Sequence, residues 1–342
     1  MTRLYTPSIV ALMLGGAAVA QTSAELEARN FHFDNYRTVI RLDMQAIRDT
    51  GVWDELLAGG AKVISQLTRE QFGFDLDALD RLCLTRRAVE GREVSDQVLV
   101  MEYNADVGVP PAYDSARYRV SVVGPYELYV DSRATKSMVM PSARMVVVGA
   151  EQRLRDILGG EPRAGLPSAD VMSLTAGKQG TLAEFVIDLK QETWLMKDIR
   201  DALRQLNVGV EWPKGDEPQL MSGRVSVVGD EDDPRLELAV VLRHAAAADG
   251  VEVTARAAAA GIAALQKVPA ARLFWPLLKD VVYERSVTDG IWRVDLGRAR
   301  AFGGVAAVAT PLVIVWLTLR DLVPGIEARL VPGADREAGG GR

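Results

Sequence analysis

The chain has few of the residues that carry catalysis or hold metal ions. It contains one cysteine, Cys83, and two histidines, His32 and His244, among 342 residues. A single cysteine excludes an internal disulfide, so stability has to come from buried apolar surface. Neither histidine has a second one at metal-ligand spacing. We therefore predict no catalytic, cofactor-binding or metal-binding residues, and we expect these three side chains to be packed or hydrogen-bonded.

Sequence motifs of the common enzyme classes are also missing. The chain has no G-x-S-x-G elbow, G-x-x-x-x-G-K-[ST] loop, G-x-G-x-x-G fingerprint or H-E-x-x-H pair. Two acidic clusters could offer oxygens to calcium: Asp75, Asp77 and Asp80 in FDLDALD, and residues 230–233 in GDEDDP. The first lacks the glycine and the final glutamate of an EF-hand and is typical of a turn or helix start. The second is typical of a solvated hairpin loop, which Pro234 ends.

Basic residues are not concentrated anywhere in the chain. The net charge is −6, and no dense run of lysine or arginine is present, which excludes the electrostatic footprint of a nucleic-acid-binding protein. Hydrophobic residues make up 48% of the chain and aromatic residues 6%. With 342 residues, this apolar content is enough to form the cores of two ordinary domains. Phe274-Trp275 and Met138–Met140 could line a site for an apolar ligand, although core packing is the commoner role of such clusters.

Residues 1–20 have the pattern of a secretory signal peptide. Arg3 is followed by an apolar stretch at 9–14 and by small residues ending at Ala20. The apolar stretch is too short for a bilayer, which needs about 20 residues. We expect cleavage after Ala20 and export to the periplasmic or cell-envelope side, with a retained anchor or a soluble start as the alternatives.

Residues 301–319, AFGGVAAVATPLVIVWLTL, form an uncharged segment between arginines. As a helix it would be about 28 Å long, close to the roughly 30 Å of a bilayer core. Pro311 and the Gly303-Gly304 pair weaken such a helix, and residues 312–319 alone resemble a buried strand. The segment is a candidate transmembrane helix, with a packed core element as the alternative. Residues 320–342 are a tail rich in glycine and proline that we expect to be partly disordered.

Residues 36–160 predict a first module that contains both strands and helices. A strand at 38–43 leads into short helices over 44–67, and a helix at 150–158 closes the module. We expect its further strands at 81–87, 97–103, 118–123, 127–131 and 144–148. The glycine- and proline-rich residues 159–180 then mark a boundary.

Residues 180–297 predict a second module with the element order β-α-β-β-α-β-β. Its strands are expected at 182–189, 220–228, 235–243, 281–287 and 291–296, with one helix beginning near Thr193 and another over 251–268. This is the order of a ferredoxin-like unit with one added hairpin strand. The predicted fold class is therefore α+β, with two modules of largely antiparallel sheet, the second ferredoxin-like.

The hexapeptide RVSVVG occurs twice, at 119–124 and at 224–229. Alternating valines suit a half-buried strand and the final glycine permits a turn, so each copy predicts the first arm of a hairpin. The two copies begin 105 residues apart, whereas the opening strands VIRL at Val39 and VIDL at Val186 begin 147 apart. A duplication with one constant offset is therefore excluded, and the identity reflects common strand chemistry. Whether the modules are distantly related stays open.

Three segments carry a resemblance to other proteins. They are VWDELL (52–57), FGFDLDALDRLCL (72–84) and ARMVVVGAEQRLRDILGG (143–160). Over its first half, and more faintly over its second, the chain resembles a diffuse set of uncharacterised exported bacterial proteins with α+β modules. That set has no established activity, so the resemblance implies export and fold class only.

These observations favour a non-enzymatic protein of the cell envelope, tethered to the membrane through residues 301–319. Its modules would present a surface to a protein or glycan partner. One alternative is an envelope hydrolase whose carboxylates the sequence does not reveal, and another is a carrier of an apolar ligand.

We predict that the mature chain begins at Gln21, because the small residues before it form the cleavage site. Amino-terminal sequencing of protein from the envelope fraction measures this directly. Carbonate extraction tests the anchor, since release into the soluble fraction would count against a membrane span at 301–319. An intact amino terminus on cytosolic protein would contradict export.

Overall fold

The structure is a computed structural model, and it describes the greater part of residues 36–308. The described residues are 36–58, 76–87, 96–107, 118–131, 136–159, 180–190, 193–212, 215–229, 234–245, 249–267, 281–299, 301, 303–305 and 308. Several predicted features therefore lie outside them. These are the signal peptide, His32, Asp75, residues 160–179, residues 230–233, Phe274-Trp275, most of 301–319 and the tail.

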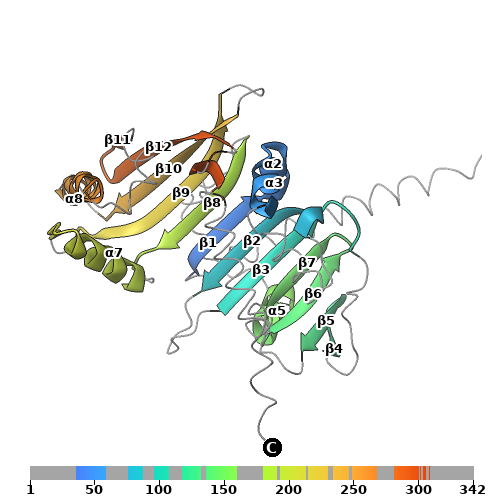
Figure 1. Cartoon of the computed structure of the whole chain (residues 1–342). Helices are drawn as coiled ribbons and strands as arrows, with labels where there is room; N and C mark the ends of the chain where they lie inside the picture. Colours follow the sequence, from blue (N-terminus) through green and yellow to red (C-terminus); the bar gives the residue numbers. More distant parts are fainter. Residues whose placement is uncertain are drawn as a thin grey trace, which may run out of the picture.

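One antiparallel sheet of twelve strands forms the framework of the described residues (Figure 1). Its spatial order is β11-β12-β10-β9-β8-β1-β2-β3-β7-β6-β5-β4. The strands are β1 (Tyr36–Asp43), β2 (Leu79–Arg87), β3 (Asp96–Tyr103), β4 (Tyr118–Val123), β5 (Tyr126–Asp131), β6 (Lys136–Ser142), β7 (Met145–Ala150), β8 (Thr181–Asp188), β9 (Pro218–Val228), β10 (Arg235–His244), β11 (Val282–Arg285) and β12 (Asp289–Arg298).

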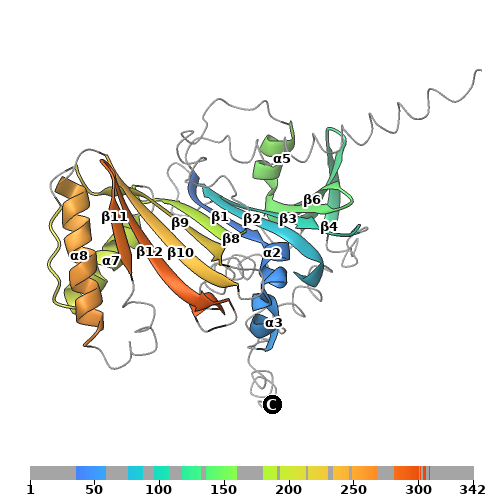
Figure 2. The same ribbon diagram turned by 90° about the horizontal axis from the view of Figure 1, so that it is seen from above.

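Helices cover both faces of this sheet. They are α2 (Met44–Asp49), α3 (Val52–Leu56), α5 (Glu151–Gly159), α7 (Thr193–Gln205) and α8 (Asp249–Leu265), with a 3₁₀ turn at Leu76–Ala78. Seen from above, α5 lies on one face of the first half of the sheet, and α2 and α3 lie on the opposite face (Figure 2). Helices α7 and α8 lie together beside the second half, where Leu203 of α7 approaches Gly261 of α8.

The two halves of the chain meet where β1 pairs with β8 in the middle of the sheet. The opening strands VIRL and VIDL lie opposite each other, with Val39 facing Val186 and Arg41 facing Glu184. The mixed α/β class and the antiparallel pairing are as predicted. The expectation of two sheets, one in each module, is wrong, because the β1–β8 ladder joins all twelve strands into one.

The ferredoxin-like arrangement of the second module is also wrong. The order of elements along the chain, β8-α7-β9-β10-α8-β11-β12, is as predicted. A ferredoxin-like unit, however, is built from split β-α-β units, in which a crossover helix joins parallel strands. Here α7 joins β8 to β9, which are antiparallel neighbours, and β9 pairs next with β10. The order of elements does not specify which strands pair, so the sequence pattern could not distinguish the two arrangements.

Strand β6 was not predicted from the sequence. It contains Met138–Met140, which sequence analysis treated as a cluster rather than as a strand, and Pro141 interrupts its pattern. Proline lacks the N–H that a ladder needs and is tolerated at irregularities. The ladder with β7 accordingly shifts register between Val139 and Ser142. Met138 is buried and Met140 is half-buried, so the cluster belongs mainly to the core.

Alternate residues of the central strands enter two separate cores, as the pleat of a strand requires. On β1, Ile40 packs in the core beneath α2 and α3, whereas Val39 packs in the core beneath α5. The helix α5 closes the second core with Leu154, Ile157 and Leu158. Burial on both faces explains why strands such as MVVVGA are continuous apolar runs.

The described part of residues 301–319 lies against the sheet. Val308 is fully buried in the same core as Leu236 and Leu296, and Val305 packs against that core. Within the described residues, no helix combines the length and the apolar character that a membrane crossing requires.

A buried hydrogen-bonded chain ties α8 to the end of β10. His244 Nδ1 donates to the carbonyl oxygen of Asp216 at 2.7 Å, so its Nε2 accepts from the Thr254 hydroxyl at 3.2 Å. Trp212 Nε1 donates to the same hydroxyl oxygen at 2.8 Å. His244 is only 2% exposed, and its partners satisfy both ring nitrogens. It is the hydrogen-bonded core histidine that the sequence favoured.

We predict that Gly250→Ala destabilises the protein by about 1–3 kcal/mol through overpacking, despite the better helix propensity of alanine. A Cβ at this position would overlap the Asp216 carbonyl oxygen and lie 2.8 Å from His244 Nδ1. Urea denaturation gives the free energy of unfolding. Gly209→Ala is the matched control, because no atom lies within 4 Å of its added methyl group. Equal stabilities of the two variants would contradict this packing.

Candidate functional site

The open sheet has two outer strands, and they differ in how well they are protected. The strand β11 has only four residues, and two of them, Glu284 and Arg285, are exposed and charged. Short strands and charges are common ways of preventing an edge from pairing with another chain. The strand β4 has six residues, contains no lysine or proline, and pairs with β5 without a register shift. Apart from the exposed Arg119, the described residues of this edge carry none of these protections.

Two apolar side chains of β4 are exposed. Val120 is 41% exposed and Val122 is 69% exposed. Both lie on the sheet face opposite α5, because Val120 is the cross-strand partner of Tyr129, which belongs to the core beneath α2 and α3. The apolar layer of that face therefore continues to the last strand and ends in uncovered valines.

The hairpin that joins β4 to β5 determines which backbone groups point outward. Its loop is Gly124-Pro125, and Gly124 has a φ of 57°, as the first central residue of a type II′ turn requires. Val123 and Tyr126 flank this two-residue loop and form a hydrogen-bonded pair, so the alternate residues of β4 turn their N–H and C=O groups away from β5. These outward residues are Tyr118, Val120 and Val122. Among the described residues, β4 pairs with β5 alone.

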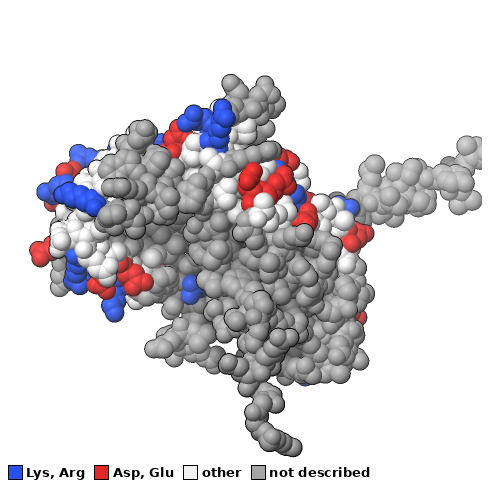
Figure 3. Space-filling view, viewed as in Figure 1, with Lys and Arg blue, Asp and Glu red and all other residues white. Residues whose placement is uncertain are grey.

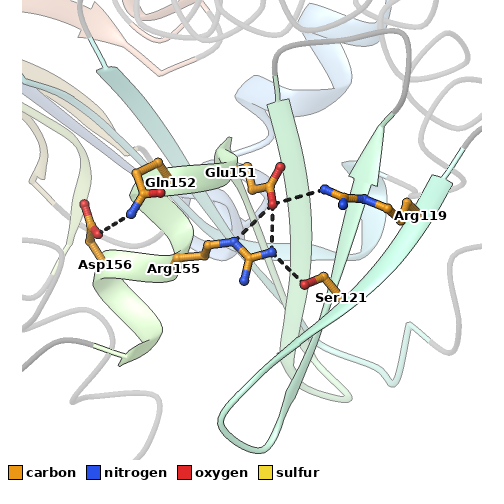
Figure 4. Close-up of polar contacts among 6 residues, drawn as sticks. All are labelled: Arg119, Ser121, Glu151, Gln152, Arg155 and Asp156. Carbon is orange, nitrogen blue, oxygen red and sulfur yellow. Dashed lines mark hydrogen bonds and ion pairs between the residues drawn. The ribbon is translucent and has the colours of Figure 1, made fainter.

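The first turns of α5 hold β4 from the other face (Figure 4). Arg155 Nη2 donates to the Ser121 hydroxyl oxygen at 2.6 Å and to Glu151 Oε1 at 2.7 Å. Arg119 Nη2 approaches the same Glu151 oxygen at 3.4 Å. Glu151 thus bridges one arginine of the helix and one of the strand, and it stands at the helix N-terminus, where a negative charge is favoured.

The contacts of Arg155 and Glu151 with Ser121 and Arg119, called here the α5 clamp, hold the outer strand β4 in position. The Glu151–Arg155 pair has the i,i+4 spacing and the orientation that stabilise a helix. Because both side chains are about one third exposed, the ion pairs themselves contribute little to stability. Their effect is geometric, since an edge that is already ordered loses less conformational entropy when another strand adds to it. The clamped β4 edge is the candidate functional site.

A second polar cluster lies at the seam between the two halves of the sheet. Glu184 of β8 is 5% exposed and faces Arg41 of β1 at 3.7 Å and Arg224 of β9 in the adjacent ladder. Burial raises the pKa of the Glu184 carboxyl, while the charges of Arg41 and Arg224 lower it by less. Several buried polar atoms here have no hydrogen-bond partner: Glu184 Oε1, Arg224 Nε, Ser226 Oγ and Thr181 Oγ1.

The described residues that face Glu184 across the seam do not supply the carboxylate pair of a glycosidase. Glycoside hydrolysis, for example, needs a second carboxylate across from the first. At Glu184 the residues across the ladders are Arg41 and Arg224. Two arginines around one buried carboxylate form an ion-pair network, which we interpret as structural.

The structure places the other sequence candidates in structural roles. Cys83 is a buried thiol, 6% exposed, in the core beneath α5. Asp77 accepts a hydrogen bond from Trp53 Nε1 at 2.8 Å, and Asp80 pairs with Arg48 at 3.3 Å. No group of three or more histidine, cysteine, aspartate or glutamate side chains among the described residues is arranged to hold a metal ion.

Two hollows among the described residues differ in the room that they offer a ligand. One beneath α5 has a volume of about 10 Å³ and is lined by apolar side chains such as Val98, Val147 and Leu154. A space of that size holds at most about one water molecule. A more open groove of about 550 Å³ lies between the C-terminal ends of α7 and α8, where Asn207 and Lys267 line it together with alanines.

The described residues on the face seen in Figure 3 carry charges of both signs. Acidic side chains gather over α2 and α3, where Asp49, Asp54 and Glu55 are exposed. Basic and acidic side chains lie together over α7 and α8.

Sequence analysis missed the residues of the β4 edge. The valine alternation of RVSVVG indicated a strand but gave no sign that this copy is outermost. Glu151 and Arg155 had a visible signal, an acid–base pair at i,i+4 at a helix start, but nothing in the sequence connected them to Ser121 about thirty residues earlier.

We predict that Glu184→Gln weakens the pH dependence of stability. Burial raises the pKa of the carboxyl above its ordinary 4.5, so its contribution to stability is fully present below that pH and is lost as pH rises through the raised pKa. The variant cannot ionise, so its free energy of unfolding should fall less between about pH 4.5 and 7.5. Glu237→Gln removes a carboxylate of β10, the second strand from β8, that pairs with Arg293 at 3.1 Å, and it serves as the control.

The measurement is urea denaturation across that pH range. If the free energy of unfolding changed with pH in the same way for the unsubstituted chain and for Glu184→Gln, burial would not perturb the carboxyl.

Comparison with known proteins finds little that is similar. No family model matches the chain, and no curated protein matches it. Among solved structures, the chain is similar to one described as crystal form I of TP0453, with a TM-score of 0.40 and 10% sequence identity over 81% of this chain and 94% of that one. A likeness at this level gives no information about function.

Proposed function

We propose that this chain is a non-enzymatic binding protein of the cell envelope that takes up a strand from a protein partner along β4. The observation that carries the proposal is the unprotected β4 edge, with Val120 and Val122 exposed and their backbone groups directed outward. In strand addition, main-chain hydrogen bonds provide affinity and alternate side chains provide specificity. The strand β4 offers outward backbone groups for such hydrogen bonds and exposed valines as the alternate side chains.

This edge favours a protein over a glycan as the partner. Outward N–H and C=O groups at regular strand spacing match the backbone of another peptide. A glycosidase that acted through Glu184 would need a second carboxylate there, and a carrier that used the cavity beneath α5 would need a larger one. Export completes the proposal, on the grounds of the signal-peptide pattern of residues 1–20. For residues 301–319, the packing of Val305 and Val308 in the core supports the packed core element over the membrane tether.

We predict that a photo-crosslinking residue at position 120 captures a polypeptide in cells. The control is the same residue at position 282 on β11, because Val282 is also an edge-strand valine and is 54% exposed. We expect an adduct at position 120 and none, or far less, at 282. The added variant Val122→Pro, which removes an outward N–H, should abolish the adduct, whereas Val122→Thr should preserve it.

Equal adducts at positions 120 and 282 would contradict the proposal, as would an adduct at 120 that Val122→Pro leaves unchanged. Either result would show contact with other chains but no strand addition at β4.

A further inference from the structure

We propose that the strand added to β4 alternates acidic and β-branched apolar side chains, with its carboxylates on the α5 face of the sheet and its apolar side chains on the opposite face. The inference rests on the proposed function and names the chemistry of the partner. It is carried by one contrast: alternate positions of β4 present exposed valines on one face and guanidinium groups, one of β4 and one of α5, on the other. Alternate side chains give strand addition its specificity.

The α5 face of the edge carries an excess of positive charge. The side chain of Arg119 is 69% exposed, and Arg155 of α5 donates to Ser121, the next β4 residue on this face, at 2.6 Å. Both arginines share the carboxylate of Glu151, whose Oε1 lies 3.4 Å from Arg119 Nη2 and 2.7 Å from Arg155 Nη2 (Figure 4). Asp156 of the same helix points away from β4 (Figure 4). Two guanidinium groups around one carboxylate leave the α5 clamp with one positive charge.

A strand added to β4 would place every second side chain on this positive face. Its residues across from Arg119 and Ser121 turn their side chains toward α5, and the alternation is the same for a parallel and an antiparallel strand. In an antiparallel pair, Cβ atoms of opposite residues are about 4.5–5.5 Å apart, where opposite charges are favourable and like charges are not. A carboxylate across from Arg119 would meet its exposed guanidinium, and one across from Ser121 would lie beside Arg155.

The opposite face of the edge favours apolar side chains in the partner. Val120 and Val122 are exposed there, and the apolar row continues inward through the buried Tyr129, the cross-strand partner of Val120. The strand β5 adds a negative charge to this face, because Glu127 lies across from Val122 and is exposed. This face therefore gives a carboxylate no attraction, whereas β-branched side chains fit a pleated surface and would cover the two valines.

The overall charge of the chain would favour the opposite kind of peptide. The net charge is −6, so a non-specific electrostatic attraction would select basic peptides. A preference for acidic side chains would therefore be a local effect of the α5 clamp. Because exposed charges are screened by salt, that preference should shrink as the salt concentration rises from about 0.05 M to about 0.5 M.

The test compares fluorescein-labelled peptides for binding to the purified mature chain, measured by fluorescence anisotropy. TVEVEVT has the proposed alternation, TVQVQVT and TVKVKVT change only its charge, and TVVEEVT has the same composition without the alternation. We expect TVEVEVT to bind roughly fivefold more tightly than TVQVQVT, because two opposite-charge pairs would form across the strands. TVKVKVT and TVVEEVT should both bind more weakly than TVEVEVT.

Substitutions of Arg119 assign the preference to this edge. Arg119→Glu should reverse the order, so that TVKVKVT binds more tightly than TVEVEVT, because the α5 clamp would then have two carboxylates and one guanidinium group. Arg119→Lys should keep the order. The control Arg144→Gln removes a similarly exposed arginine, which pairs with Asp106 at 3.2 Å in the turn between β6 and β7, and should leave the order unchanged. Near-ultraviolet circular dichroism establishes that each variant is folded.

Equal affinities for TVEVEVT, TVQVQVT and TVKVKVT would overturn the inference, as would equal affinities for TVEVEVT and TVVEEVT. An acidic preference that a folded Arg119→Glu leaves unchanged, or failure of every peptide to bind, would overturn it too. If one of these results is found while position 120 still captures a polypeptide in cells, the proposed function stands and the chemistry assigned to the partner is wrong. If no peptide binds and position 120 captures nothing, the proposed function fails as well.

Discussion

The pairing of β1 with β8 is the constraint on which the rest of the structure depends. Each strand opens its own half of the chain, and because the two run antiparallel at the centre, each half extends outward from them. Ile40 facing Phe185 lies on the apolar α2 side, and Arg41 facing Glu184 lies on the opposite face. A slip of one residue would exchange the two faces. Since the sheet remains open, this arrangement also leaves one outer strand in each half, and those two edges have to be protected or used.

The ion pair at this seam is better understood as a means of fixing register than as a source of stability. Burying charges is expensive, and a buried pair often contributes less than apolar side chains of the same size would. The raised pKa of Glu184 shows that Arg41 and Arg224 do not fully compensate its burial. In a register shifted by one residue, however, Glu184 would face Ile40 or Leu42 of β1 and would lose Arg41, so that Arg224 of β9 would be its one facing charge. A buried carboxylate with less charge compensation is more costly to bury. We infer that the pair mainly disfavours wrong alignments of the two halves.

Local patterns in the sequence predicted most elements but not how they pair. The range predicted for β4 matches the observed strand at both ends, and each RVSVVG copy begins a hairpin, because period-2 alternation and a terminal glycine are local properties. The ferredoxin-like order failed because pairing is decided by contacts between distant segments. β6 was missed because Pro141 and adjacent methionines obscure its alternation. The candidate site was beyond prediction for a related reason, since the position of a strand within a sheet depends on which strands pair beside it, and nothing local encodes that.

The two copies of RVSVVG have the same sequence but different neighbouring strands, so they show how neighbouring strands change the exposure of a valine. In β9, which has β8 on one side and β10 on the other, Val225 is 4% exposed; in β4, with β5 alone among the described strands, the corresponding Val120 is 41% exposed. The arginine that begins each copy lies near a glutamate, because Arg224 faces Glu184 and Arg119 approaches Glu151. Among the described strands, β9 has a second neighbour and β4 does not. Strand addition at β4 would bring Val120 toward the environment that Val225 already has, and the burial of that apolar surface is the driving force on which the proposed association relies.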